Sequence, residues 1–126
     1  MQDFIAGMVV GVILLQTIVF APTIFTTLDF ASAGKVLRAL FPKFFRMLSL
    51  FGVLTIISLS LDEGASLPRY IIATLTIIFP LTCALLIPMT NSATDRGDQK
   101  KFKQLHKISV ILTMLVLIAN LAFSWV

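Results

Sequence analysis

The stretch FIAGMVVGVILLQTIVFAPTIF, residues 4–25, decides the fold, because it contains no charged residue. A helix needs about 20 predominantly apolar residues to cross a bilayer. A strand of a membrane barrel instead alternates apolar and polar residues over about ten positions, and this stretch does not alternate. Met1, Gln2 and Asp3 precede it without a basic segment, so we expect a retained span rather than a cleaved signal peptide.

Three further runs, residues 44–61, 70–87 and 108–126, have the same apolar character. The chain of 126 residues is 58% hydrophobic and 13% charged, and its mean hydropathy is +1.00. A soluble domain of this size buries only about two-thirds of its chain surface and has no room for so much apolar area. We therefore predict an all-α integral membrane four-helix bundle, a single domain over residues 1–126 with spans at about 4–25, 44–61, 70–87 and 108–126.

The basic residues predict the orientation of the bundle. Nine of the ten lie in or beside the first and third connections, and only Arg69 lies elsewhere. Lysine and arginine accumulate on the cytoplasmic side of membrane proteins. We therefore expect an inner or plasma membrane protein with cytoplasmic basic loops at 26–43 and 88–107 and both termini outside. The expected partners of these side chains are anionic lipid head groups, not nucleic acid.

Both basic connections contain helical patterns. Apolar residues recur at helical spacing from Phe30 to Phe41, with Lys35 and Arg38 on the opposite face, which predicts a short amphipathic helix in the interface between spans 1 and 2. Pro42 ends this helix or starts the next span. In the third connection we expect a turn over 90–97, then a helix capped by Asp98 that leads into the fourth span.

Polar residues inside the spans form one pattern. At 100° per residue, a single stripe of the last helix carries five polar residues: His106, Ser109, Thr113, Asn120 and Ser124. Polar groups in a bilayer usually face other helices or a water-filled cavity. Two interpretations stay open: interhelical hydrogen bonds worth about 0.6 kcal/mol each, or the lining of a polar pathway. Gln16 lies at a matching depth in the first span, which suggests contact with Thr113 or Asn120.

Two further features are common in membrane helices. Gly7 and Gly11 form a GxxxG motif, for which we favour packing inside the bundle over dimerisation. Pro80 interrupts the third span, which marks either a binding site built on a broken helix or a kink satisfied by neighbouring hydroxyl groups.

Motifs typical of catalytic or metal-binding sites are scarce. The chain has one cysteine, Cys83, and one histidine, His106, and it contains no zinc, phosphate-loop or nucleophile motif. We predict no enzyme activity and no cofactor, and His106 is the single candidate metal ligand.

Three segments together resemble a known family: VVGVILLQTIVFAPTIFTTLD, ALFPKFF, and IPMTNSATDRGD followed by KKFKQLHKISVILTMLVLIANL. They are similar to the small four-helix membrane proteins related to transmembrane protein 205, a domain without established biochemical function. A more distant similarity is to copper-resistance D-like and haem-binding four-helix membrane proteins, which use histidines within their spans. The motif positions that carry the main resemblance are Leu40, Phe41, Pro42, Pro88, Asn91, Asp95, Phe102 and His106.

The resemblance and the polar stripe leave two main functional hypotheses. One is transport or permeation of a small solute or ion through a homo-oligomer, because a four-helix bundle of this size has little internal volume. The other is a non-enzymatic accessory or scaffold subunit of a larger membrane complex. A haem or copper protein is a third alternative.

Overall fold

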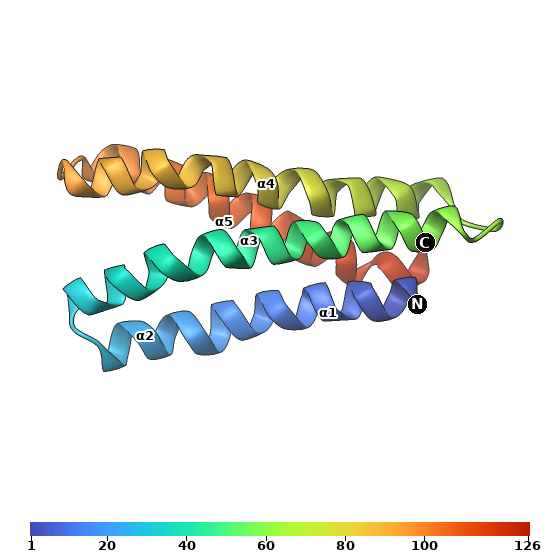
Figure 1. The fold of residues 1–126 in the computed structure, drawn as a ribbon, viewed down its shortest axis with the longest axis horizontal. Coiled ribbons are helices and arrows are strands. Elements are labelled where there is room, and N and C mark those ends of the chain that lie inside the picture. Colours follow the sequence, from blue (N-terminus) through green and yellow to red (C-terminus); the bar gives the residue numbers. More distant parts are fainter.

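The computed structural model describes residues 1–126 as four long helical rods without strands. The first rod joins α1 (Gln2–Leu14), a π-helical turn (Leu15–Phe20) and α2 (Ala21–Thr27). The others are α3 (Phe30–Ser60), α4 (Leu67–Asp95) and α5 (Gln99–Leu121), and α5 is followed by a 3₁₀ turn (Phe123–Trp125). Figure 1 shows the rods side by side, with both chain ends at the same end of the bundle.

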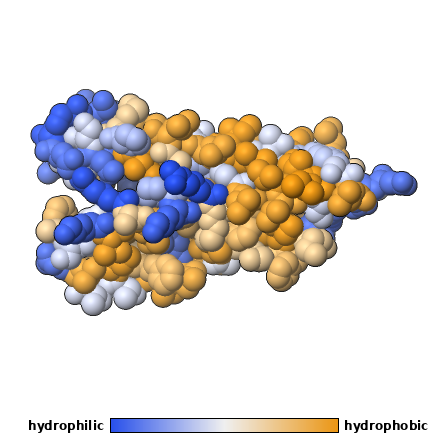
Figure 2. Space-filling model, viewed as in Figure 1, coloured by the Kyte–Doolittle hydropathy of each residue, from blue (hydrophilic) through white to orange (hydrophobic).

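All four rods are long and apolar enough to cross a membrane, which confirms the predicted all-α four-helix bundle. Figure 2 shows a broad hydrophobic surface around the middle and hydrophilic residues at both extremes. We call the extreme that carries the connections 28–29 and 96–98 the basic end. The opposite extreme carries both chain ends and the connection 61–66, and we call it the terminal end.

Helices α3 and α4 approach each other closely at Gly52. A methyl group added there would lie 2.7 Å from Cγ1 and 2.9 Å from the backbone nitrogen of Ile77. Nearby, the Ser49 hydroxyl donates to the Ile77 carbonyl at 3.1 Å. This bond joins the two helices one turn before Pro80, which is buried inside a continuous α4, so the helix is not broken there. The nearby hydroxyl groups of Thr76 and Thr82 donate to the carbonyls of Ile72 and Ile78, not to the Thr76 carbonyl that the proline leaves free.

The GxxxG prediction was wrong for packing within the chain. A methyl group added at Gly7 or Gly11 meets no atom within 4 Å, and both glycines are exposed. Among the glycines, Gly52 is the one at which an added methyl group would meet a neighbouring helix, and it belongs to no GxxxG motif.

The predicted amphipathic helix at Phe30–Phe41 is helical but is not a separate element. It is the first part of α3, which runs without a break through Pro42 and so follows the bundle instead of lying flat in the interface. A proline deprives only one carbonyl of its helical partner. The rings of Phe41, Phe44 and Phe45 pack together across this point, with centroids 5.2–6.4 Å apart, and hold the two halves in line.

The predicted turn over 90–97 was also wrong, because α4 continues to Asp95 and the connection is only residues 96–98. Pro88 lies inside the helix, and Ala93 beyond it is fully buried, so packing maintains the helix. The stop comes from Gly97, whose φ of +71° favours glycine. Asp98 then accepts from the backbone N–H of Lys101 at 3.1 Å, which confirms the predicted cap of α5.

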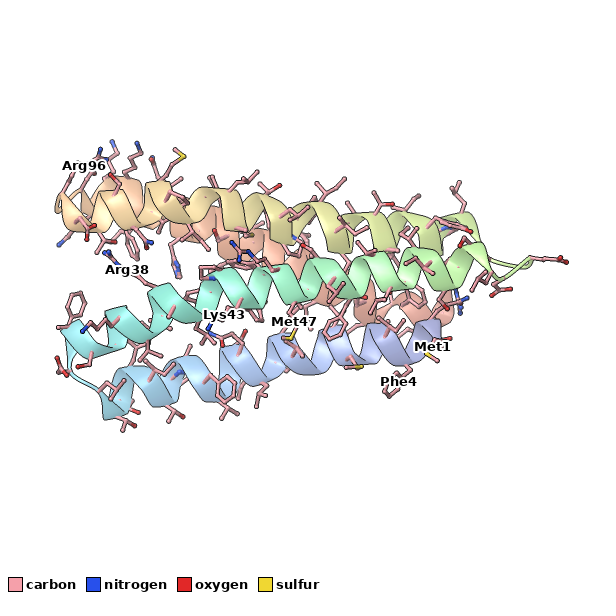
Figure 3. All side chains as sticks on the ribbon, viewed as in Figure 1. Met1, Phe4, Arg38, Lys43, Met47 and Arg96 are labelled. Atoms are coloured by element: carbon pink, nitrogen blue, oxygen red, sulfur yellow. The ribbon has the colours of Figure 1, made fainter.

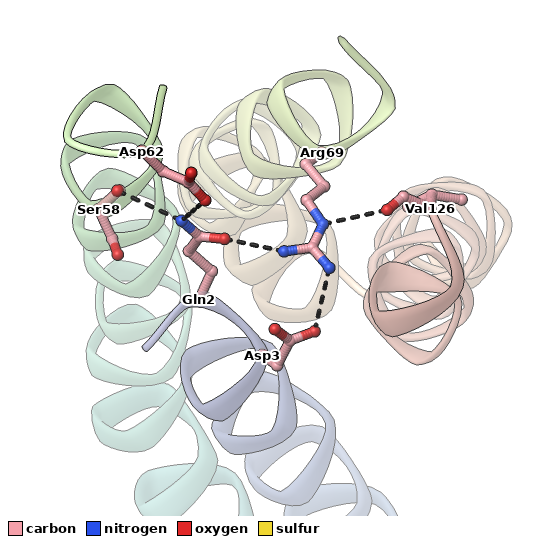
Figure 4. Close-up of polar contacts among 6 residues, drawn as sticks. All are labelled: Gln2, Asp3, Ser58, Asp62, Arg69 and Val126. Carbon is pink, nitrogen blue, oxygen red and sulfur yellow. Dashed lines mark hydrogen bonds and ion pairs between the residues drawn. The ribbon is translucent and has the colours of Figure 1, made fainter. Parts of the chain in front are cut away.

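A polar cluster joins all four rods at the terminal end (Figure 4). Arg69 of α4 donates to Gln2 at 2.8 Å and to the carbonyl of Val126 at 3.1 Å, and it lies 3.5 Å from Asp3. Gln2 in turn donates to Asp62 at 3.0 Å. These hydrogen bonds hold the pKa of Asp62 below its usual value, with Gln2 the main cause and the N–H of Gly64 the next.

Candidate ligand-binding cavity

The bundle is held together at the terminal end and hollow at the basic end. A cavity of about 830 Å³ lies between the rods there, and all four rods contribute to its wall. From Gln99 to Met114 the wall along α5 is about 22 Å long at 1.5 Å per residue. Figure 2 shows the molecule indented at this end between two groups of hydrophilic residues. The volume falls within the range of pockets that hold small organic ligands, roughly 300–1,000 Å³.

Most of the wall is apolar. It includes Ala21 and Phe25 of the first rod and Val110 and Met114 of α5. Helix α2 has no buried residue of its own, so this part of the first rod covers the cavity without packing closely against its neighbours. Six phenylalanines line the cavity: Phe25, Phe30, Phe41, Phe44, Phe45 and Phe102. Such a wall favours an apolar body of substantial size.

Gln16 lies at the inner part of the cavity and has an unusual environment. Its side chain is only 6% exposed, and its amide nitrogen Nε2 is buried without a hydrogen-bond partner. The one other such atom in the chain is Ser66 Oγ, at the start of α4 near the terminal end. A buried donor without an acceptor costs about 1–3 kcal/mol. Gln16 also lies in the π-helical turn, a local irregularity that is frequent at functional sites.

Charged side chains gather at the mouth. Arg38 of α3 lines the cavity and forms a two-contact ion pair with Asp95 of α4, its Nη1 lying 3.3 Å from Oδ2. Figure 3 shows Arg38 directed from α3 toward the α4 side, whereas Lys43 points toward the first rod. Lys103 of α5 also lines the mouth and has no carboxylate partner within ion-pair distance. Asp98 also lines the cavity and lies 4.0 Å from Arg96, so Lys103 is the basic side chain of the mouth without an acidic partner, and it favours anions and neutral dipoles over cations.

The structure divides the predicted polar stripe. His106, Ser109 and Thr113 line the cavity, as does Gln16 from the opposite rod. Asn120 does not: its amide donates to the Thr76 hydroxyl of α4 at 2.8 Å and to the carbonyl of Val116 at 2.9 Å. Ser124 is exposed in the final 3₁₀ turn and lines nothing.

The predicted contacts of Gln16 are not hydrogen bonds in the structure. Asn120 is bonded to α4, and the Thr113 hydroxyl donates to the carbonyl of Ser109 at 2.7 Å. Interhelical hydrogen bonding therefore accounts for Asn120, while Gln16 and Thr113 share a wall of the cavity without pairing.

Residues of the motif quoted above gather around the same cavity. Its wall includes Phe41, Asn91, Phe102 and His106, and Asp95 holds Arg38 at the mouth. The exposed His106 ring stacks on Phe102 with centroids 5.7 Å apart. Leu40 lines a smaller hollow on the other side of Phe44, while Pro42 and Pro88 lie within their helices. No three His, Cys, Asp or Glu side chains gather closely enough to hold a metal ion.

A family model described as a domain of unknown function, DUF4149, matches residues 4–99. The chain belongs to this family. The match includes α1 to α4 and the turn into α5, and thus three of the four walls of the cavity. It stops before the α5 residues that line the cavity beyond Gln99. Searches of curated proteins and of solved structures found no match.

Several wall residues were not singled out by their sequence. In the sequence, Phe25 belongs to an apolar span, and Phe30 and Arg38 belong to the segment predicted to lie in the interface. Only the structure shows that all three line one cavity. A signal was present for Phe44 and Phe45, which adjoin the quoted Leu40–Pro42 motif. Nothing in the sequence indicates that Gln16 lacks a hydrogen-bond partner, because that depends on which groups the neighbouring hydroxyls bond in the folded protein.

Proposed function

We propose that this protein binds a small, largely apolar molecule in the cavity and exchanges it between the bilayer and the aqueous phase at the basic end. The observation that carries the proposal is the cavity of about 830 Å³ with its phenylalanine wall. Exchange at one end is favoured over a continuous pore through a single chain. A packed core that includes Val9, Ile13 and Val116, and then the cluster around Arg69, lie between the cavity and the terminal end.

The proposed orientation places the basic end in the cytoplasm. Lysine and arginine gather there, where they would meet anionic head groups and hold the mouth of the cavity at the interface. A ligand could then enter either from the lipid, between α2 and α5, or from water at the mouth.

Equilibrium dialysis of the detergent-solubilised protein against 2-isopropenylnaphthalene tests the binding step. Gly34 lines the cavity and an added methyl group there meets no atom within 4 Å, so Gly34→Trp fills the mouth without displacing the backbone. The matched control is Gly11→Trp, on an open outer face of α1. We expect saturable binding to wild type and to Gly11→Trp, and binding at least about tenfold weaker in Gly34→Trp. Equal uptake by all three proteins would show only partition into the micelle and would contradict the proposal.

A second candidate, an accessory subunit of a larger complex, is favoured by the open faces of Gly7 and Gly11. Small residues on a lipid-facing helix let another helix approach closely. Cross-linking of Gly7→Cys in a Cys83→Ser background tests it. A different protein captured at this position, but not at Leu115→Cys on α5, would support it, whereas capture of a second copy alone would indicate a homo-oligomer instead. No captured protein in intact membranes would count against it.

A further inference from the structure

Gln16 lines the inner part of the cavity, and one hydrogen-bonding group of its amide is left without a protein partner. Gln16 is more than nine-tenths buried, and its Nε2 has no partner. Neither predicted partner accepts from it: the Thr113 hydroxyl donates to the Ser109 carbonyl and the Asn120 amide to the Thr76 hydroxyl, and Nε2 makes no bond to either residue. A half-turn of the amide exchanges its oxygen and nitrogen, so the group can present its N–H to the cavity without moving the helix.

The surroundings restrict what could accept this hydrogen bond. Apart from hydroxyl groups such as those of Thr17 and Thr113, the wall is mostly phenylalanine and aliphatic side chains, so the acceptor belongs to a largely apolar molecule. A cation is disfavoured because Lys103 lines the mouth without a carboxylate partner, whereas the charge of Arg38 is paired with Asp95. A pure hydrocarbon fits the walls but leaves the amide unpaired, and sites built to hydrogen-bond a ligand discriminate against analogues that lack the group.

From these observations we infer that the ligand is an apolar molecule with an oxygen acceptor of the ketone, quinone or ester type, and that Gln16 determines specificity by donating to that oxygen. The inference rests on the proposed binding function and names its ligand class. The phenylalanines supply affinity for the body of the molecule, and Gln16 distinguishes the oxygenated ligand from its hydrocarbon analogue.

Two probes of the same shape test the inference. In 2-acetylnaphthalene a carbonyl oxygen replaces the terminal methylene of 2-isopropenylnaphthalene, and otherwise the two molecules match. In equilibrium dialysis, the uptake measured with the Gly34→Trp protein is subtracted as the background from partition into the micelle. Wild type should then bind the ketone about 3- to 10-fold more tightly than the hydrocarbon. Gln16→Leu should lose this preference while it retains its affinity for the hydrocarbon. Thr113→Val should keep the preference, because its hydroxyl already donates to Ser109.

The outcomes separate the two claims. Equal affinity of wild type for the two probes, or a preference that persists in Gln16→Leu, overturns the inference and leaves the binding function intact. Failure of both probes to bind wild type above the Gly34→Trp background overturns the binding function itself. Gln16→Met, which keeps the length of the side chain without its donor, repeats the test if the leucine variant does not fold.

Discussion

Gly52→Ala should destabilise the protein, although the same substitution elsewhere in these helices should stabilise it. The added methyl carbon would lie 2.7 Å from Ile77 Cγ1, 2.9 Å from the Ile77 nitrogen and 3.0 Å from the Thr76 carbonyl carbon. Two of these atoms are backbone, so α3 and α4 must separate. Overpacking of this kind costs about 1–3 kcal/mol, and separation weakens the Ser49–Ile77 bond, worth about 0.6 kcal/mol. The helix propensity of alanine returns only about 0.5–1 kcal/mol.

The assay is unfolding of the micelle-solubilised protein by increasing sodium dodecyl sulfate, followed by far-ultraviolet circular dichroism. We expect Gly52→Ala to unfold at lower denaturant, with a net loss of about 1–3 kcal/mol. Gly34→Ala is the matched control on the same helix, since an added methyl group there meets no atom within 4 Å. It should gain up to about 1 kcal/mol. A Gly52→Ala midpoint at or above that of wild type would refute the close approach of α3 and α4.

Three further predictions concern the polar residues. Gln16→Leu should stabilise the ligand-free protein by about 1 kcal/mol in the same titration, because it removes a buried donor without a partner; a loss of stability would show that Gln16 is paired. Asn120→Leu should cost about 0.6–1.7 kcal/mol, because it removes the bond to Thr76; a neutral result would contradict that bond. The folded-state pKa of Asp62 is lowered, so its stabilising effect is present above its unfolded pKa of about 3.9 and disappears as pH falls through the folded pKa. The stability difference between wild type and Asp62→Asn should therefore be constant above about pH 5 and shrink below pH 4 in pH-dependent unfolding; a difference that does not change with pH would contradict it.

Much of the fold follows from local sequence properties. The four spans follow from the length of the apolar runs, and the cap at Asp98 from its position before a helical pattern. Polar clusters and prolines were poorer guides to where helices end. Helices α3 and α4 continue through Pro42 and Pro88 because packing of the residues beyond them outweighs one lost hydrogen bond.

The candidate site could be predicted only in part. Helical periodicity placed His106, Ser109 and Thr113 on one face, and the structure puts all three on one wall. The same periodicity could not distinguish these residues from Asn120, which bonds to α4 instead of lining the cavity. Where the cavity ends along α5 depends on contacts between helices, which periodicity does not describe. The exposed backbone of Gly7 and Gly11 shows the same limit, since a GxxxG motif does not specify which neighbour it faces.

Cysteine accessibility tests the central claim, that an open chamber extends from the basic end to the depth of Gln16. In a Cys83→Ser background, Thr113→Cys lies on the inner wall of the cavity, whereas Leu115→Cys lies two residues along α5 on its exposed outer face. In liposomes, a small water-soluble maleimide should modify Thr113→Cys and leave the lipid-facing Leu115→Cys unmodified, and 2-acetylnaphthalene should slow the reaction at position 113. Equal inertness of the two cysteines, or a reaction at Thr113→Cys that the ketone does not slow, would contradict the account.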